Sequence, residues 1–272
     1  MSKEIQQGNK NNIIKLSDLI KRDTGKGFEN ITAEDQAIPF IRIGQAMSEV
    51  ITHQLIDNCK MGDIYNNVTM ECFTGSEGIN VIPVKYEHVY IHWEKKDAGD
   101  KKAPKAVYKN GDPNIPEYER NEKDNVDYLT DGSGDYLARA FQWYVKYQTK
   151  ENRWNDALIS FQSTQLKKSK KWLSMCISRG GPLFSNIYNL KTTSETSSSY
   201  KFFGWEPSFV RQLNDDEINL YQDCKKFNEL ISKGEIKVSH EEESMADNSS
   251  NLSKKSNKET SSNKNTDDSL PF

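Results

Sequence analysis

Residues 136–162 read YLARAFQWYVKYQTKENRWNDALISFQ, and this segment predicts a long β-hairpin. Tyr136–Gln148 and Trp154–Gln162 are rich in aromatic and β-branched residues, which suit the pleated surface of a sheet. The polar residues 150–152 between them are typical of a turn. Two long neighbouring strands of this kind predict a mainly β architecture.

Further strands and helices are predicted on both sides of this hairpin. They are a helix at Ile14–Lys21, strands at Gly62–Met70 and Gly78–Trp93, a helix at Thr164–Ser178, a hairpin of Asn186–Thr193 with Tyr200–Ser208, and a helix at Asn214–Ser232. Antiparallel strands with a helix between them favour an oligonucleotide-binding (OB) barrel. The predicted fold class is mainly β (α+β): an OB-like antiparallel barrel with one inserted helix, a C-terminal helix and a disordered acidic tail.

The chain divides into four parts by composition. Residues 1–60 are expected to pack on the barrel as a segment with a disordered start, and residues 61–212 to form the OB-like domain. Within that domain, residues 95–135 hold three prolines and predict a long surface loop. Residues 213–239 carry the C-terminal helix, and residues 240–272 form the tail.

The net charge of the chain is concentrated in its tail. Residues 241–272 hold seven Asp/Glu and four Lys, which accounts for the whole net charge of −3 and leaves the rest neutral. The tail has no aromatic residue before Phe272, so it cannot recover the entropy that ordering costs. In a neutral body, a surface for nucleic acid must come from local clusters of Lys and Arg.

The composition excludes several other classes of protein. The four cysteines form no CxxC pair, so neither a disulfide framework nor a zinc ribbon is expected. No apolar run resembles a signal peptide or is long enough to cross a membrane. His88 and His92 share one face of a predicted strand, but no third metal ligand accompanies them. We therefore expect no metal, no cofactor and a cytoplasmic protein with reduced thiols.

The predicted helix at Thr164–Ser178 contains the densest cluster of positive charge, because four of the five residues from 167 to 171 are lysines. At helical spacing Leu166, Leu173 and Ile177 fall on one face, with Ser169 and Cys176 beside them, and this face is expected to pack on the barrel. Lysines on the opposite face would release condensed counterions from each phosphate they neutralise. The candidate DNA contacts are Lys167, Lys168, Lys170 and Lys171, with Trp172 at the border of that face and Arg179 farther along it.

Aromatic residues on the strand that ends at Trp93 form a second candidate surface. Strand periodicity places Tyr86, His88, Tyr90 and His92 on one face and Trp93 on the other. Bases stack on exposed rings with about 1–3 kcal/mol each and with little sequence preference. Tyr86, Tyr90 and Trp93 are the candidate stacking residues, and burial of these rings in the core is the alternative.

Two other classes of function stay open. Asp131 and Asp135 in the long loop are a candidate pair of metal-binding carboxylates, as in nucleases and DNA-processing enzymes, although their Asp-Gly-Ser-Gly-Asp segment is also typical of a flexible turn. The chain has no phosphate-cradling glycine loop and no nucleophile elbow, so we expect no enzyme activity. The other alternative is a replication adaptor that binds only proteins.

The folded part of the chain resembles a family of tailed-phage single-stranded DNA-binding proteins. The resemblance covers about residues 23 to 240, and its motifs agree in order and spacing. The motifs are Phe28-Glu29-Asn30, Glu34-Asp35-x-Ala37-Ile38-Pro39-Phe40, Gly78-Ile79-x-Val81-Ile82-Pro83, Tyr90-Ile91-x-Trp93, ALISFQSTQLKKSKKW at residues 157–172, Tyr188-x-Leu190-Lys191-Thr192 and Phe203-Gly204-Trp205.

A second resemblance lies at the C-terminus, which reads DDSLPF. It is similar to the acidic tip of bacterial and phage single-stranded DNA-binding proteins, whose terminal Phe enters a basic pocket on replication and repair enzymes. It departs from that pattern in having Leu270 where Ile is usual and only two acids. The resemblance implies that the docking residues are Asp267, Asp268, Leu270, Pro271 and Phe272.

Together these features predict a non-enzymatic single-stranded DNA-binding protein of phage DNA replication, recombination and repair, located in the host cytoplasm. It is expected to coat and protect single-stranded DNA. The resemblance at the tip implies that it recruits replication proteins such as DNA polymerase and helicase-primase. A homo-oligomer is left open.

Overall fold

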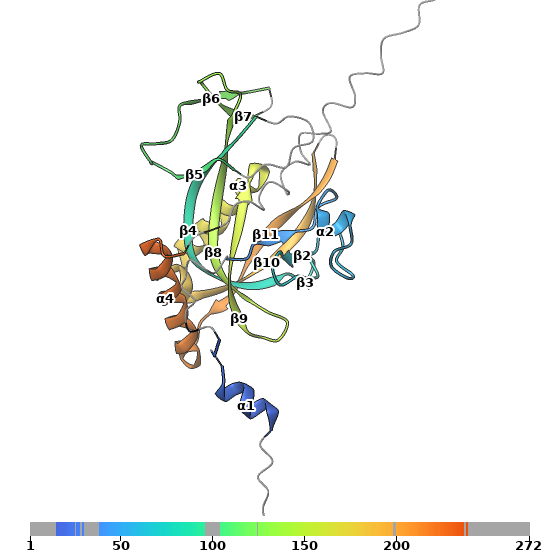
Figure 1. Cartoon of the computed structure of the whole chain (residues 1–272), viewed down its shortest axis with the longest axis vertical. Helices are drawn as coiled ribbons and strands as arrows, with labels where there is room; N and C mark the ends of the chain where they lie inside the picture. The colour runs from blue at the N-terminus through green and yellow to red at the C-terminus, as the bar shows by residue number, and fades with distance from the viewer. Residues whose placement is uncertain are drawn as a thin grey trace, which may run out of the picture.

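The computed structural model describes residues 15–24, 26–27, 29, 38–95, 104–123, 125–197, 200–236 and 238. A large antiparallel sheet of eight strands forms the body, and a three-stranded sheet lies beside it (Figure 1). The strands of the small sheet are β1 Ile41–Ile43, β2 Ile64–Asn66 and β3 Cys72–Phe73. The strands of the large sheet are β4 Ile79–Trp93, β5 Ala106–Lys109, β6 Tyr118–Asn121, β7 Val126–Leu129, β8 Tyr136–Gln148, β9 Trp154–Gln162, β10 Asn186–Ser197 and β11 Tyr200–Gln212.

The large sheet is organised around its two longest strands, β4 and β8. The strand order is β11-β10-β4-β8-β7-β6, with β5 paired to β4 and β9 paired to β8. The pairing of β4 with β8 runs from Val81 opposite Tyr147 to Trp93 opposite Tyr136, and its register shifts after Pro83. A proline has no N–H to donate to a ladder, so a bulge at this position is expected. The predicted hairpins β8–β9 and β10–β11 are both confirmed.

The mainly β class is confirmed, but the expected OB-like barrel is not, because the described sheet is not closed. Strands β9 and β11 are both edges, and the segment before β1 meets β9 at a single parallel bridge. The free edge of β11 is instead bonded by side-chain amides. Gln45 both donates to and accepts from the backbone of Phe203, and Gln165 accepts the N–H of Trp205. Amide side chains thus satisfy edge groups that a further strand would otherwise pair.

Four helices complete the described part: α1 Leu16–Arg22, α2 Glu49–Thr52, α3 Leu166–Arg179 and α4 Ile218–Lys233. The 3-10 turns Ser163–Gln165, Leu183–Ser185 and Asp215–Glu217 precede α3, β10 and α4. Helix α4 starts with a capping box of Asn214 and Glu217 and ends at Gly234, which has φ of 75°. The prediction of one inserted and one C-terminal helix is confirmed.

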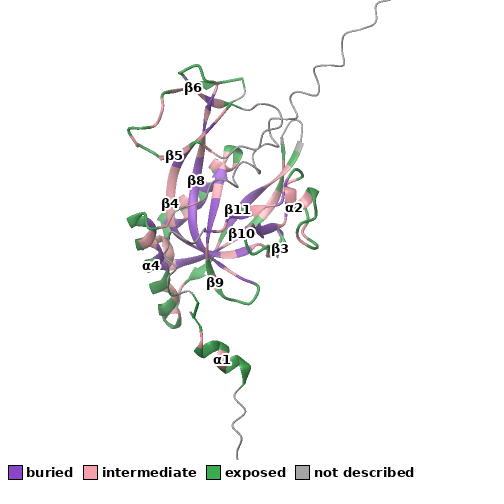
Figure 2. Cartoon of the chain, viewed as in Figure 1, coloured by how far each residue is buried: buried purple, intermediate pink, exposed green. Residues whose placement is uncertain are grey.

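Helices α3 and α4 cover opposite faces of the sheet. Trp172 of α3 packs in one core with Trp143, whereas Phe227 of α4 packs in another with Tyr144. Trp143 and Tyr144 are neighbours on β8, and successive side chains on a strand point to opposite faces. The buried stretches of β4, β8 and β9 therefore lie between two helical layers (Figure 2).

The prediction of a featureless loop over residues 95–135 is wrong for its described part. This segment contains β5, β6 and β7, which extend the sheet beyond α3. Leu129 and Tyr118 from it pack on Tyr90 of β4 and Leu137 of β8. Isolated apolar residues such as these do not produce the alternating pattern by which a strand is predicted. They are buried only because β4 and β8 provide an apolar surface for them to cover.

The N-terminal segment meets the sheet mainly through its second half. Phe40 and Ile41 are buried in the two main cores, and the Phe40 N–H donates to Asn67 Oδ1. Helix α1, in contrast, buries no residue. Residues 239–272 lie outside the described part, and with them the predicted tail and its docking residues Asp267, Asp268, Leu270, Pro271 and Phe272.

Candidate functional site

Helix α3 docks on the sheet through a face rotated from the predicted one: Leu166 and Leu173 pack against the core as predicted, but Ile177 does not. Its buried residues are Ser169, Trp172 and Cys176, while Ile177 is 70% exposed. The Trp172 indole stacks on Trp143 with 4.0 Å between ring centroids, and Trp143 Nε1 donates to Ser169 Oγ at 2.7 Å. Burying a tryptophan removes more apolar surface from water than burying an isoleucine, so the helix turns toward Trp172.

The prediction that Trp172 borders the basic face is therefore wrong. Its exposed fraction is 0%, and besides Trp143 it contacts the rings of Phe161 and Tyr188. No face of the indole is available to a base. Trp172 holds the helix in place and does not contribute to the surface.

The predicted lysines lie on the solvent side of α3. Lys167, Lys170 and Lys171 are exposed. Lys168 is half-buried and pairs with Glu195 of β10 at 3.2 Å. Within the part that the structure describes, the other three lysines have no carboxylate partner. Their charge is thus uncompensated locally and attracts anions.

Two positive side chains of α3 lie against rings of different strands. Lys170 Nζ lies 6.0 Å from the centre of the Phe141 ring on β8. Arg179 packs its guanidinium on Phe209 of β11, 3.5 Å from the ring centre. These two residues are about 14 Å apart along the helix axis. Lys170 therefore extends toward the strands, whereas Arg179 belongs to the far end of the helix.

Beyond Lys170 the same face of the sheet continues as a row of rings and an arginine. We define the strand row as Tyr86, His88 and Tyr90 of β4 with Phe141 and Arg139 of β8. The His88 ring is 4.9 Å from Phe141 and 5.1 Å from Tyr90, and the Arg139 guanidinium lies 5.5 Å from the Tyr90 ring. Tyr86, His88 and Arg139 are partly exposed. The strand row therefore lies beside Lys170, on the face of the sheet that α3 covers.

Two of the predicted stacking residues are buried. Tyr90 is 7% exposed because Tyr118 and Arg139 lie against its ring. Trp93 is 6% exposed and packs with Ile91 on the opposite face of the sheet. The assignment of Trp93 as an exposed ring is wrong, and Tyr90 is the member of the strand row that packs with Leu129 and Leu137 in a buried cluster.

Positive charge converges on His88. Burial lowers its pKa, and the charges of Arg139 and Lys170 lower it further. His88 Nε2 and Arg139 Nε are buried polar atoms, and neither has a hydrogen-bond partner among the described residues. Unpaired buried polar atoms cost free energy, and a bound group with hydrogen-bonding oxygens would relieve that cost.

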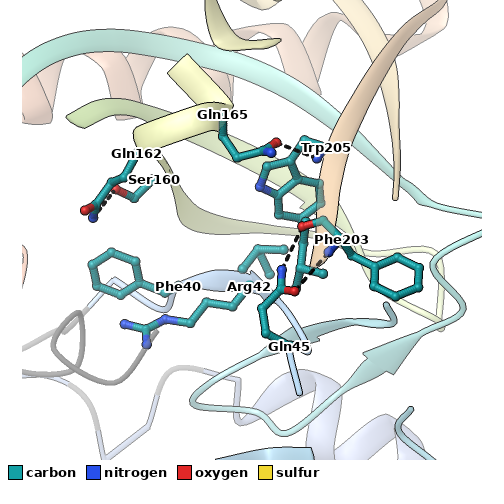
Figure 3. Close-up of a pocket in the computed structure, with 10 residues that line it drawn as sticks. Phe40, Arg42, Gln45, Ser160, Gln162, Gln165, Phe203 and Trp205 are labelled. Carbon is teal, nitrogen blue, oxygen red and sulfur yellow. Dashed lines mark hydrogen bonds between the residues drawn. The ribbon is translucent and has the colours of Figure 1, made fainter. Parts of the chain in front are cut away.

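A pocket of about 130 Å³ lies between β1, the end of β9 and β11 (Figure 3). It is lined by Phe40, Ile41, Arg42, Ile43, Gln45, Ser160, Gln162, Gln165, Phe203 and Trp205. Gln162 donates its amide N–H to Ser160 Oγ. Gln162 Oε1 and Arg42 Nη2 are buried and have no hydrogen-bond partner among the described residues. Aromatic walls with a free donor and a free acceptor match a nucleobase. Sequence reasoning missed this pocket because its residues come from segments far apart in the chain.

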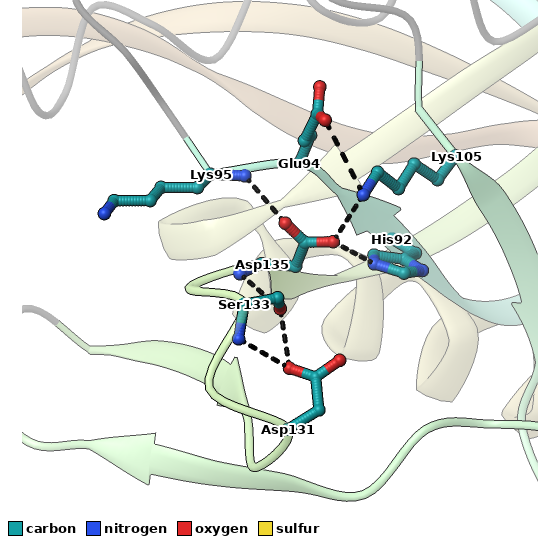
Figure 4. Close-up of polar contacts among 7 residues, drawn as sticks. All are labelled: His92, Glu94, Lys95, Lys105, Asp131, Ser133 and Asp135. Atoms are coloured by element: carbon teal, nitrogen blue, oxygen red, sulfur yellow. Dashed lines mark hydrogen bonds and ion pairs between the residues drawn. The ribbon is translucent and has the colours of Figure 1, made fainter.

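Asp135 is buried and belongs to a charged network at the top of β8 (Figure 4). Its carboxylate accepts hydrogen bonds from Lys105 Nζ at 2.8 Å, from the Lys95 N–H at 3.0 Å and from His92 Nε2 at 3.0 Å. The bond from Lys105 is the main cause that lowers the pKa of Asp135 to about 2, and burial opposes it. The carboxylate is thus saturated by donors of the protein itself.

Asp131, the other candidate metal ligand of the long loop, is exposed and bonds within its own turn. It accepts hydrogen bonds from the Ser133 N–H at 2.9 Å and from Ser133 Oγ at 2.6 Å (Figure 4). Bonds of this kind form an Asx turn, the interpretation that the sequence offered as the alternative. Asp131 and Asp135 therefore serve separate hydrogen-bond sets, and their geometry gives the nuclease alternative no support.

The Asp135 network predicts a pH-dependent contribution to stability. Because the pKa of Asp135 is lower in the folded chain than in the unfolded chain, its contribution is complete above pH of about 4 and disappears toward pH 2. The Tm of the Asp135→Asn variant should therefore change less than that of the unaltered chain over this window. Thermal unfolding followed by circular dichroism would measure it. Asp57→Asn, at an exposed carboxylate, is the control, and parallel curves for Asp135→Asn and the unaltered chain would contradict the prediction.

The fold and the surface define an α+β protein with an open antiparallel sheet and one helix that presents uncompensated lysines. The chain belongs to the Pam3 phage gp34-like protein family, whose model matches residues 9–237. The predicted phage family is confirmed at this level, and the family description names no ligand or activity. No curated protein and no solved structure matches the chain. None of the helices in the described ranges is long and apolar enough to span a membrane.

The structure brings together only part of the predicted site. Lys170 lies beside Phe141, and Tyr86 and His88 contact the same ring. Arg139 and Phe141 are two residues apart on one strand, so strand periodicity alone already places them on one face. Arg42, Gln162 and Gln165 carried no such signal, since only the tertiary fold makes them neighbours.

Proposed function

We propose that this phage-family protein binds single-stranded DNA stoichiometrically and without catalysis. The sugar-phosphate backbone would follow Lys167, Lys170 and Lys171, and bases would face the partly exposed rings of Tyr86 and His88. The observation that carries the proposal is that Lys170, which has no carboxylate partner among the described residues, lies against Phe141 next to His88 and Arg139.

Physical chemistry favours a single strand over a duplex for this surface. The rings of the strand row lie in the face of a sheet, between a helix and neighbouring strands, and only an unpaired base can bring its flat face to them. Lysines without local carboxylates supply affinity that does not depend on sequence. The pocket beside Arg42 and Gln162 would accept one base by its edge, which adds a preference among bases to general binding.

One gel experiment tests the proposal against its alternatives. A labelled oligo(dT) strand is mixed with the full chain, with and without Mg²⁺, at low and high salt. A salt-sensitive mobility shift with intact oligonucleotide supports the proposal. Shortening of the strand that depends on Mg²⁺ would instead support a nuclease, and an unshifted, intact strand would support an adaptor that binds only proteins.

The C-terminal tip is proposed to recruit replication proteins. Asp267, Asp268, Leu270, Pro271 and Phe272 supply carboxylates, an apolar ring and a terminal carboxylate, the groups by which terminal peptides are captured. The matching partner would carry a basic pocket with an apolar floor, and phage DNA polymerase and helicase-primase are the candidates.

Removing Phe272 should abolish capture of such a partner while oligo(dT) affinity stays unchanged, because the ring is the main apolar anchor of the tip. Pull-downs of purified polymerase and helicase-primase with the full chain and with the chain lacking Phe272 would measure this. A Ser269→Ala chain is the control, since it keeps the acids and the ring. Equal recovery with and without Phe272 would rule out docking by the tip.

A further inference from the structure

Three side chains with metal-binding atoms converge beside the small sheet. Cys59 lies in the loop after α2, Asp63 directly before β2, and Cys72 in β3. One ligand atom from each lies within 4.8 Å of the ligand atoms of the other two. Across the described residues this is the only group of three or more His, Cys, Asp and Glu with such spacing. Sequence spacing did not predict this group, because the two cysteines are not a CxxC pair.

The spacing is close to that of a tetrahedral zinc site. Zinc binds thiolate sulfur at about 2.3 Å and carboxylate oxygen at about 2.0–2.2 Å, which places tetrahedral ligand atoms about 3.5–3.8 Å apart. The three ligand atoms already lie within 4.8 Å of one another. A contraction of about 1.3 Å at most would close the group around a cation. Two thiolates also favour a soft or borderline cation over Mg²⁺ or Ca²⁺.

The carboxylate of this group is held in position by its surroundings. Asp63 Oδ2 accepts the Lys60 N–H at 2.9 Å, and Oδ1 accepts the Gly75 N–H at 3.0 Å. Each oxygen keeps a further lone pair, so both bonds are compatible with a metal ligand. Outer hydrogen bonds of this kind orient ligands in metal sites. Cys72 is fixed in turn by the β2–β3 ladder, in which it faces Tyr65.

We propose that Cys59, Asp63 and Cys72 bind one Zn²⁺ ion, with water as the fourth ligand. The ion would connect the loop after α2 to the start of β2 and to β3, and it would act structurally. The site is independent of single-stranded DNA binding, because none of its ligands belongs to α3 or to the strand row.

A disulfide between Cys59 and Cys72 is the main competitor for the same sulfurs. Both cysteines are free in the structure, and a disulfide would use only the two sulfurs. The carboxylate of Asp63 also lies within 4.8 Å of both sulfurs, and this convergence of three ligand atoms favours a cation between reduced cysteines.

The test measures zinc directly on the full chain purified under reducing conditions. After incubation with equimolar Zn²⁺ and desalting, we expect one zinc per chain and a Tm that falls on addition of EDTA. Cobalt in place of zinc should give the absorption of a thiolate-bound ion. Cys72→Ser and Cys59→Ser should lose both signals, whereas Cys176→Ala, which removes a buried thiol elsewhere, should keep its zinc.

Asp63→Asn gives a second, milder readout. It should weaken zinc about 10–100-fold without removing it, since both sulfurs stay in place. A folded, reduced chain without zinc above background would overturn the proposal. Unchanged zinc content in the folded Cys72→Ser chain would also overturn it. The same holds if Cys59 and Cys72 are found oxidised to a disulfide and no zinc is bound.

Discussion

Replacing Lys167, Lys170 and Lys171 together with alanine should weaken binding to oligo(dT) about 100-fold at about 0.1 M salt. Each lost phosphate contact removes about 0.7 from the slope of log affinity against log salt, so the slope should flatten by about 2 for the three. These lysines are exposed and lack described carboxylate partners, so the fold should be unaffected. Fluorescence anisotropy over a salt series measures both quantities.

A matched control separates this surface from the general charge of the protein. Lys225, Lys226 and Lys233 of α4 are also exposed, and α4 covers the opposite face of the sheet. Changing these three to alanine alters the net charge equally but should change affinity only slightly. If both triple variants bind oligo(dT) with the same affinity, the DNA strand does not follow α3. If the α3 triple keeps its affinity and slope, the lysines do not contact phosphate.

The Trp172→Ala chain should lose about 3–5 kcal/mol of unfolding free energy, the range typical of emptying a buried aromatic site. Trp172 is fully buried, and it stacks on Trp143, whose indole N–H is bonded to Ser169 of the same helix. Deleting the ring leaves a cavity at the centre of the larger core and loosens the docking of α3. Urea unfolding followed by circular dichroism measures the loss.

Ile177→Ala on the same helix is the control for Trp172. Ile177 is 70% exposed, so its truncation should cost less than about 0.5 kcal/mol. A large loss for Ile177 with a small loss for Trp172 would mean that α3 docks in the rotation predicted from its leucines. The paired measurement therefore tests the helix orientation on which the lysine surface depends.

Local signals in the sequence were sufficient for most elements of the fold. The β8–β9 hairpin, the β10–β11 hairpin and the start and end of α4 all follow from periodicity, turn residues and caps. These signals act over a few residues, because a strand alternates and a helix repeats regardless of what lies across from it. The mainly β class, the lysine cluster and the membership of a phage family could therefore be anticipated.

The rotation of α3 about its axis shows what local sequence patterns cannot predict. Helical spacing alone made Leu166, Leu173 and Ile177 a plausible core face, yet Trp172 is the residue that enters the core. That choice depends on Trp143, which lies on another element and offers a flat partner. Trp143 and Trp172 are too far apart in the sequence for a local pattern to show that they pack together. Only tertiary packing could therefore decide which side of the helix faces the core.

The sequence by itself determined which long segments are strands and helices and where positive charge is concentrated. The tertiary structure decided that the sheet stays open, that Tyr90 and Trp93 are covered, and that Cys59, Asp63 and Cys72 meet. The physical reason is that burial and ligand geometry are set by neighbours distant in the chain. A side chain on a strand always points to one of two faces, but which face is covered depends on the element that packs there.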